Sequence, residues 1–414
     1  MYKTRIVDSL IKEKLEYTRA VLIEGAKYCG KTSTAEQLSA SRLYMQDPDN
    51  TESNIALAQT QPSILLKGSN PRLIDEWQLA PCLWNAVRHA VDMRKEKGLF
   101  ILTGSFAAKE DETLHSGIGR IARMLMRPMS LIESGDSNGE VSLSSLFRND
   151  REICSISSLK MEDIAYLLVR GGWPDSIGLS EKQAKAKCKD YVENIANVDI
   201  CRIDGVKRSP QKVKAFLRAV SRNISTSASL SSLINDMESE DEMIDGKTAS
   251  VYRNALEKLF LIEDLPAWTP ALRSKTPIRT IPTRHFVDPS IACACLGAYP
   301  SDLIKDYRTF GLLFESLCIR DLRIYAESIG GEVYHFRNAN GLEADAIIHL
   351  DDGRWAAVEI KLGLNKLDAS AANLLKLSSM TVNKPSFLML MTSVGTAYRR
   401  PDGVYVVPIG CLKN

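Results

Sequence analysis

A short stretch near the amino terminus has the residue types and spacing that hold phosphate groups. Residues 24–33 read EGAKYCGKTS and fit the pattern G-x-x-x-x-G-K-[ST] at every fixed position. The glycines let backbone N–H groups point at phosphate oxygens, the lysine neutralises phosphate charge, and the next hydroxyl ligates Mg²⁺. We therefore predict a nucleoside triphosphate site with Thr32 as a metal ligand, made of Gly25, Ala26, Lys27, Tyr28, Cys29, Gly30, Lys31, Thr32 and Ser33.

The elements around this loop are those that the motif requires. Residues 20–23 (AVLI) indicate a short buried strand, and the residues from Thr32 onward indicate the first turns of a helix. The positive amino-terminal end of that helix would face the same anion as the loop. The alternative is a glycine turn between a strand and a helix that binds nothing.

A second strand ends in two acids roughly 50 residues beyond the loop. Residues 72–76 read RLIDE, in which Asp75 would hold Mg²⁺ through water and Glu76 would activate the attacking water. An apolar run that ends in two acids is common at strand ends. Its position after a phosphate loop favours the catalytic interpretation.

Two further segments could complete this site. Residues 99–105 predict another buried strand, and Thr103 or Ser105 at its end could sense the γ-phosphate, since parallel strands converge on a ligand at their carboxyl ends. A plain Gly-Ser turn explains the same residues. Arg120 follows a glycine-rich turn, which suits a finger that stabilises phosphoryl charge in a neighbouring subunit of a homo-oligomer.

In this order the motifs EGAKYCGKTS, LIDEWQLAP, FILTGS and GIGRIARMLMRPMSLIE resemble the AAA+ type P-loop ATPases of bacteria and archaea whose ATPase domain precedes a domain of unknown function. The resemblance covers roughly residues 18–135. It implies an ATP-binding α/β domain with a parallel sheet and helices on both faces, Asp75 and Glu76 as the Walker B pair, and a sensor at residues 103–105. The chain departs from common AAA+ proteins because it has no obvious second sensor arginine.

The middle of the chain is predicted to be helical. A polar stretch at residues 135–158 indicates a boundary, and three helical runs followed by an apolar LIEDLPAW have the outline of a winged helix-turn-helix. Its third helix exposes Lys247 and Arg253, which could contact DNA. The acidic residues of 238–245 oppose that contact, and a purely structural or protein-docking helical domain is the alternative.

A second set of acids lies near the carboxyl terminus. Two strands joined by DDGR carry Asp345 on the first strand, and Glu359 and Lys361 on the same face of the second. Two carboxylates and a lysine can hold Mg²⁺ and stabilise phosphoryl charge. This arrangement resembles the PD-(D/E)-x-K nuclease superfamily, in which Glu315 matches an additional helix acid. The alternative is an inactive nuclease-like fold in which Lys361 only pairs with the acids.

Length and composition predict several domains in a cytoplasmic protein. A chain of 414 residues is too long for one core, and no run approaches the ~18 apolar residues of a membrane span, so we expect no membrane partner. The amino terminus lacks the apolar core of a signal peptide. The predicted domains are the ATPase domain, a helical linker, the winged-helix-like domain and a restriction-endonuclease-like domain, at residues 1–158, 159–208, 209–284 and 285–414.

Together these patterns predict an ATP hydrolase that uses Mg²⁺ and ATP to control DNA engagement or processing by a nuclease-like domain. A nucleotide-dependent switch or scaffold, which binds DNA or protein without cutting, is the alternative. A small-molecule kinase would leave the carboxyl-terminal hairpin unexplained.

Overall fold

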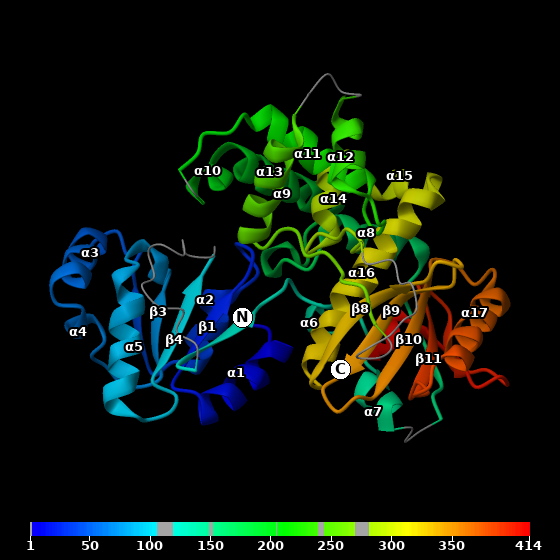
Figure 1. Cartoon of the computed structure of the whole chain (residues 1–414), viewed down its shortest axis with the longest axis horizontal. Helices are drawn as coiled ribbons and strands as arrows, with labels where there is room; N and C mark the ends of the chain where they lie inside the picture. Colours follow the sequence, from blue (N-terminus) through cyan, green and yellow to red (C-terminus); the bar gives the residue numbers. More distant parts are fainter. Residues whose placement is uncertain (1, 106–118, 149–151, 204, 239–243, 270–280) are drawn as a thin grey trace. The chain divides into compact units, whose positions relative to one another are not determined.

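Five aliphatic stretches form one parallel sheet in the computed structural model of the chain (Figure 1). The sheet order is β2 (Ser41–Tyr44), β3 (Arg72–Asp75), β4 (Phe100–Gly104), β1 (Ala20–Glu24) and β5 (Ile121–Leu125). The strands β1, β3 and β4 are buried almost throughout, as strands covered on both faces are. β4 therefore separates the strand before the phosphate loop from the strand that ends in two acids.

The structure describes residues 2–105, 119–148, 152–203, 205–238, 244–269 and 281–414. Most of the acidic turn predicted to oppose DNA binding, residues 239–243, lies outside these ranges. Among the described residues, no helix has the length and apolar character needed to cross a membrane.

Helices cover both faces of the parallel sheet, as predicted. Leu22 and Ile74 pack in a hydrophobic cluster with three helices, while Val21 and Leu73, which point the other way, are equally buried. Two other helices contact the strands and each other. The first group is α3 (Thr51–Thr60), α4 (Pro62–Leu65) and α5 (Cys82–Arg94), and the second is α1 (Ile6–Tyr17) and α2 (Lys31–Leu38).

The parallel sheet belongs to the first of two compact units. This unit comprises Met1–Pro128 with two short segments, Asp199–Lys207 and Ala255–Phe260, and the second unit comprises the rest. These contact units divide at residue 128, whereas the predicted first domain ends at residue 158. The polar stretch supplies two strands to the second unit: β6 (Val141–Ser142) pairs with β14 (Leu412–Lys413), and β7 (Ser155–Ile156) pairs with β12 (Thr396–Arg399).

A mixed sheet of seven strands lies in the second unit. Its order is β7, β12, β13 (Tyr405–Pro408), β11 (Phe387–Thr392), β10 (Trp355–Lys361), β9 (Glu343–Leu350) and β8 (Gly331–Arg337). β9 runs antiparallel to both of its neighbours, whereas β10, β11 and β13 are parallel. α16 (Tyr307–Glu327) precedes β8, and α17 (Leu367–Met380) connects β10 to β11 (Figure 1). Residues 307–380 therefore follow one another as a helix, three strands and a helix.

Helices also pack together in this second unit, across two predicted boundaries. Helices that lie before residue 209, between residues 209 and 285, and after residue 285 contact one another, and the predicted domain boundaries there stay a prediction. Short loops and apolar helix faces bury one shared core here. The helices are α8 (Met161–Arg170), α9 (Glu181–Asn194), α11 (Pro210–Arg222), α14 (Pro289–Leu296) and α15 (Pro300–Lys305).

Three helices in the middle of the chain precede a pair of antiparallel bridges. α11 is followed by α12 (Leu230–Glu238) and α13 (Gly246–Lys258), and then Ile262 bridges Phe286 and Leu265 bridges Thr283. The expected order of three helices and an extended segment is present. The winged-helix assignment itself stays a prediction.

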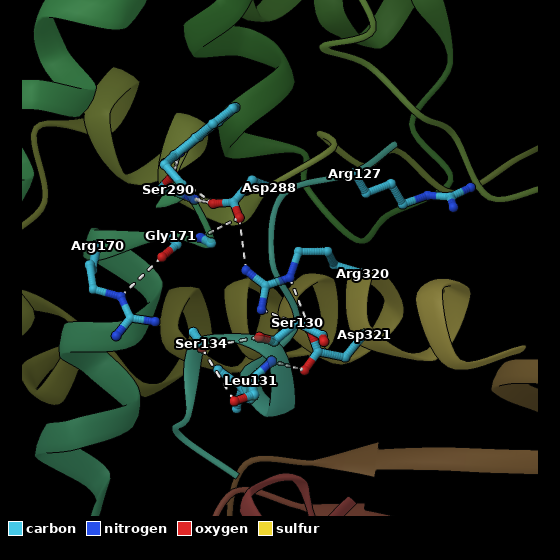
Figure 2. A network of polar contacts seen from close by, with 12 residues as sticks. Arg127, Ser130, Leu131, Ser134, Arg170, Gly171, Asp288, Ser290, Arg320 and Asp321 are labelled. Carbon is cyan, nitrogen blue, oxygen red and sulfur yellow. Dashed lines mark hydrogen bonds and ion pairs between the residues drawn. The ribbon is translucent and has the colours of Figure 1, made fainter. Parts of the chain in front are cut away.

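A buried network of charges joins distant segments of the second unit (Figure 2). The Arg320 guanidinium lies 2.8 Å from a carboxylate oxygen of Asp288 and 2.7 Å from one of Asp321. Asp321 accepts a hydrogen bond from the backbone N–H of Leu131, and Asp288 accepts one from Gly172. Because these three charged side chains are at most 2% exposed, each depends on the others for its polar partners.

The sequence Gly-Gly-Trp-Pro at residues 171–174 has glycines where two backbone segments come very close together. A Cβ atom at Gly172 would lie 2.1 Å from the backbone oxygen of Met129, whose N–H donates to Gly172 at 2.6 Å. The preceding Gly171 has a φ of +71° and closes α8. The two glycines thus end the helix and let the chain after residue 128 approach the network.

Candidate functional site

The backbone of the phosphate loop follows β1 directly and enters α2. Gly25 has a φ of +151°, and a Cβ there would lie 2.2 Å from the backbone oxygen of Met126. Gly30, with a φ of +106°, is the residue before the first turn of α2. Tyr28 also has a positive φ, of 65°, although it carries a side chain. Such backbone strain is concentrated at ligand sites.

Lys31 is buried within this loop. Its side chain is 5% exposed, and its ammonium donates hydrogen bonds of 2.9 Å to the backbone oxygens of Gly25 and Ala26. The loop's own carbonyls therefore hold the lysine at the point where the loop curves. A buried cation beside the amino end of a helix is a suitable environment for phosphate.

Asp75, at the carboxyl end of β3, joins the loop to the neighbouring strand. Its Oδ1 accepts hydrogen bonds from the hydroxyls of Thr32, at 2.7 Å, and Thr103, at 2.5 Å. The strand register brings Asp75 close to Thr103, because the residues that precede them, Ile74 and Leu102, lie opposite each other. A hydroxyl and a carboxylate oxygen are the hard ligands that Mg²⁺ takes alongside phosphates, so these residues fit that ion.

Glu76 leaves the strand in a left-handed conformation with a φ of 54°. Its backbone N–H donates to the Thr103 hydroxyl at 3.3 Å, and its carboxylate accepts from the Ser105 hydroxyl at 3.2 Å and from the side-chain amide of Gln78. Burial raises the pKa of the Glu76 carboxyl, and the nearby Lys31 charge opposes that rise. A raised pKa suits a group that takes a proton near neutral pH.

The sequence patterns did not single out Gln78. It lies in the 3₁₀ turn Trp77–Leu79, is buried, and has no hydrogen-bond partner for its Oε1 among the described residues. A polar residue two positions after the acid pair was the available signal. The structure thus adds a positioning residue beside Glu76.

The remaining loop residues are distributed around this arrangement. Lys27 pairs with Asp199, in one of the short segments of the same unit, at 2.5 Å. The Cys29 thiol is buried and donates to the backbone oxygen of Met126 at 3.3 Å. Ser33 is exposed on the first turn of α2. We find no polar side-chain contact that these residues share with Asp75 or Glu76 among the described residues.

Arg120 lies at the other end of the sheet from the phosphate loop. It immediately precedes β5, and the register places Ile121 opposite Ala20, at the amino end of β1. Its guanidinium bonds both carboxylate oxygens of Asp92 on α5 at 2.8 Å. Arg120 is therefore not part of the nucleotide site of its own chain.

The acids predicted near the carboxyl terminus lie on neighbouring elements. The Lys361 ammonium is 2.8 Å from Oε1 of Glu359 and 3.7 Å from Oδ2 of Asp345. Asp345 also accepts a 2.7 Å hydrogen bond from the backbone N–H of Ile360. Glu359 is 4% exposed, and its Oε2 has no hydrogen-bond partner in the described part of the chain.

Burial perturbs every acid in this second site. It raises the pKa of Glu359 to about 7, with a further contribution from the Asp345 charge, while Lys361 opposes the rise. It raises the pKa of Glu315, on α16, well above the ordinary value, and the Asp345 charge adds to this. The site therefore concentrates carboxyl groups that are costly to ionise without a cation.

These carboxyl groups do not form a ready-made metal site. No three His, Cys, Asp or Glu side chains of the described residues are grouped so that they could hold a metal ion. The expectation that Glu315, Asp345 and Glu359 hold a metal ion stays a prediction. The Lys361 ammonium contacts Oε1 of Glu359, and the backbone N–H of Ile360 donates to Oδ2 of Asp345.

The two predicted DNA contacts differ in their surroundings. Lys247 is exposed at the start of α13. Arg253 instead pairs with Asp264 at 2.9 Å, and Arg284 binds the same carboxylate. This ion pair joins α13 to the bridged segment that follows it, and the DNA contact of Arg253 stays a prediction.

Comparison with known families agrees with the geometry of the first site. Residues 17–134 match a family model described as an AAA domain. This segment, which holds the phosphate loop and the acid pair, is thus similar to AAA domains. The rest of the chain matches two models described as domains of unknown function, DUF8612 over residues 161–302 and DUF4143 over residues 310–412.

Matches to whole proteins are more remote. A Walker-type ATPase of Pyrococcus abyssi has 14% identity and a TM-score of 0.42, with 70% of this chain and 94% of that chain covered. No curated protein matches the chain. The match over residues 17–134 agrees with the expected ATPase domain, and the nuclease-like character of residues 285–414 stays a prediction.

Proposed function

We propose that the chain hydrolyses ATP with Mg²⁺ and uses this cycle to control how its carboxyl-terminal nuclease-like domain engages or cuts DNA. The observation that carries the first half is the meeting of Thr32, Thr103 and Asp75 beside the buried Lys31. The proposed metal ligands and the phosphate-binding loop meet there, and the half-buried Glu76, the proposed general base, directly follows Asp75.

The residues of the first site divide the chemistry among them. Lys31 and the loop N–H groups would hold the phosphates, and Thr32 with Asp75 would hold Mg²⁺, which neutralises charge on the transferring phosphoryl group when bound. Thr103 fixes the Asp75 carboxylate by its hydrogen bond. Glu76 would take a proton from the attacking water, while Ser105 and Gln78 orient its carboxylate.

Two observations support the nuclease half of the proposal. The order α16, β8, β9, β10 and α17 follows the helix, three strands and helix of the PD-(D/E)-x-K nucleases that these residues resemble. In addition, the buried Oε2 of Glu359 lacks a hydrogen-bond partner among the described residues. A bound cation or a hydrogen-bond donor of a substrate would supply that partner. Mg²⁺ needs only one or two carboxylates when substrate phosphates complete its shell.

A nucleotide-dependent switch or scaffold without nuclease activity is the second candidate. The contact between Lys361 and Glu359 favours it, because a lysine that neutralises the acid explains both residues without any metal. In that case the second site is a stabilising ion pair, and ATP would control binding alone.

Degradation of labelled linear and single-stranded DNA separates the two candidates. We expect cleavage with Mg²⁺ or Mn²⁺ by the wild type, with a dependence on ATP, and a loss of roughly 100-fold in Lys361→Ala. Lys376→Ala, which removes an exposed lysine of α17, is the matched control. The absence of cleavage under all these conditions, with ATP hydrolysis intact, would favour the switch.

We also propose that Arg120 acts in trans within a homo-oligomer. In an equal mixture of the Lys31→Ala and Arg120→Ala proteins, some interfaces would join the intact phosphate loop of one variant to the intact Arg120 of the other. The mixture would then regain part of the ATP hydrolysis that each variant lacks. Mixtures that stay as inactive as the separate proteins would oppose this role and leave Arg120 as the partner of Asp92.

A further inference from the structure

A concave surface of the second unit is lined by cations. A groove of about 880 Å³ lies between α9, α11 and the end of α14. Among the described residues that line it, one is acidic and six are basic: Lys182, Lys185, Lys189, Lys214, Arg218 and Arg222. Neither the nucleotide site nor the acids around Glu359 contribute to this groove.

The cations form two regular rows because of their spacing on two helices. Lys182, Lys185 and Lys189 lie three and four residues apart on α9, and the three cations of α11 are each four residues apart. Residues at these spacings share one face of a helix. Four residues advance a helix by about 6 Å, which is comparable to the separation of successive phosphates along a nucleic acid strand.

Local contacts modify the charge along the groove. Glu193 pairs with Lys214, and Asp236 pairs with Arg222 at 3.3 Å. Lys185 donates to the backbone oxygen of Gly297, and its ammonium lies 3.2 Å from the ring centre of Tyr299. Lys182 and Lys189, by contrast, are exposed at the groove. The row on α9 thus supplies the more accessible charge.

We propose that this groove holds the phosphate backbone of nucleic acid, an inference that rests on the DNA engagement proposed above and gives it a location. A regular row of cations in a concave surface suits a polyanion with evenly spaced charge, whereas a membrane would require a flatter surface. Lysines and arginines contact phosphate oxygens whatever the bases are, so we expect contact chiefly to the backbone.

Tyr299 adds an aromatic element to the same surface. Its side chain is 45% exposed beside the cations. Aromatic rings next to a basic groove are platforms on which the bases of single strands stack. The groove therefore favours single-stranded over double-stranded nucleic acid.

A matched pair of lysines on α9 provides the test. Lys189 lines the groove, whereas Lys187, two residues earlier and about 200° away around the helix, does not. We would measure binding of a fluorescent single-stranded oligonucleotide over a series of salt concentrations, with ATP hydrolysis as the check of folding. Lys189→Glu should weaken binding roughly 10-fold and lower the salt slope by about 1, while Lys187→Glu leaves both unchanged.

Other outcomes would overturn the inference. Unchanged oligonucleotide binding in Lys189→Glu and in Lys182→Glu/Lys189→Glu would show that the groove is not the binding site, without contradicting the proposed DNA engagement. Loss of binding in Lys247→Glu alone would place the binding site on α13. A wild type that binds no oligonucleotide at low salt rejects both the groove and the DNA half of the proposed function. Binding of vesicles that contain anionic phospholipid, lost in Lys189→Glu, without oligonucleotide binding would assign the groove to a membrane surface.

Discussion

The side-chain amide of Gln78 donates a hydrogen bond to Oε2 of Glu76, two residues earlier in the chain. The bond stabilises the ionised carboxylate more than the neutral acid, because negative charge strengthens the interaction with the donor, and so it lowers a pKa that burial raises. Gln78 thereby helps to keep the proposed general base ionised.

Removal of this donor should alter the pH dependence of ATP hydrolysis. In Gln78→Ala the pKa of Glu76 rises further, so the base is protonated at a higher pH. We expect kcat to fall roughly 10-fold at neutral pH and the acid limb of its pH profile to move to higher pH. Gln37→Ala, at an exposed glutamine of α2, is the control. An acid limb at the wild-type position would show that Gln78 is only a packing residue.

Alanine at Gly25 should disable the loop. The new Cβ would meet the Met126 backbone oxygen, so the loop must shift, and we expect nucleotide binding to weaken at least about 10-fold and the domain to lose roughly 2 kcal/mol of stability. Gly311→Ala, on α16, meets nothing within 4 Å and should stabilise the chain by about 0.5–1 kcal/mol. Calorimetric titration with ATP and thermal unfolding measure the two effects. Normal ATP affinity in Gly25→Ala would contradict the loop geometry.

The buried network predicts a large effect from one substitution. Asp288→Ala leaves the Arg320 guanidinium without one of its two carboxylates in a site closed to water, which should cost about 3–5 kcal/mol in the free energy of unfolding. Urea unfolding of the wild type and the variant measures this loss in the free energy of unfolding. Asp352→Ala, which breaks an exposed pair with Arg354, should change that free energy far less. Equal effects would mean that the network contributes no more than a surface pair.

His285 predicts an acid-sensitive fold. Burial lowers the pKa of His285 well below the usual value, and the Arg323 and His335 charges add to this. The imidazole therefore stays neutral in the folded state, whereas in the unfolded chain it becomes charged below about pH 6.5. Stability from this residue is complete above that pH and falls by up to about 1.4 kcal/mol per pH unit below it. His285→Gln should flatten the slope between pH 6.5 and 5, whereas His89→Gln, at an exposed histidine, should not. An unchanged slope in His285→Gln would disprove the assignment.

The first site could be predicted from the sequence because its chemistry is local. The loop needs two glycines, a lysine and a hydroxyl within eight residues, and Asp75 with Glu76 ends one strand. Gln78 escaped prediction because its role depends on the left-handed turn at Glu76, which returns the chain toward the carboxylate. No residue type in this segment of the sequence predicts such a turn.

One hairpin of the second unit was predictable from the sequence, but the contacts of its side chains were not. The hairpin of β9 and β10 follows from alternation and a DDGR turn, whereas the ion pair between Lys361 and Glu359 depends on side-chain geometry. The difference between the predicted boundary at residue 158 and the division of the contact units at residue 128 has a similar cause. The Leu131 N–H reaches Asp321, 190 residues further on, and such pairing has no local signature.

ATP hydrolysis in two variants tests the central claim most directly. We would measure phosphate release and retention of labelled ATP by the wild type, Lys31→Ala and Glu76→Gln. The account predicts that Lys31→Ala loses both binding and hydrolysis, and that Glu76→Gln keeps binding but loses at least about 100-fold in hydrolysis. Wild-type rates of hydrolysis in Lys31→Ala would contradict the assignment of this loop as the catalytic ATP site.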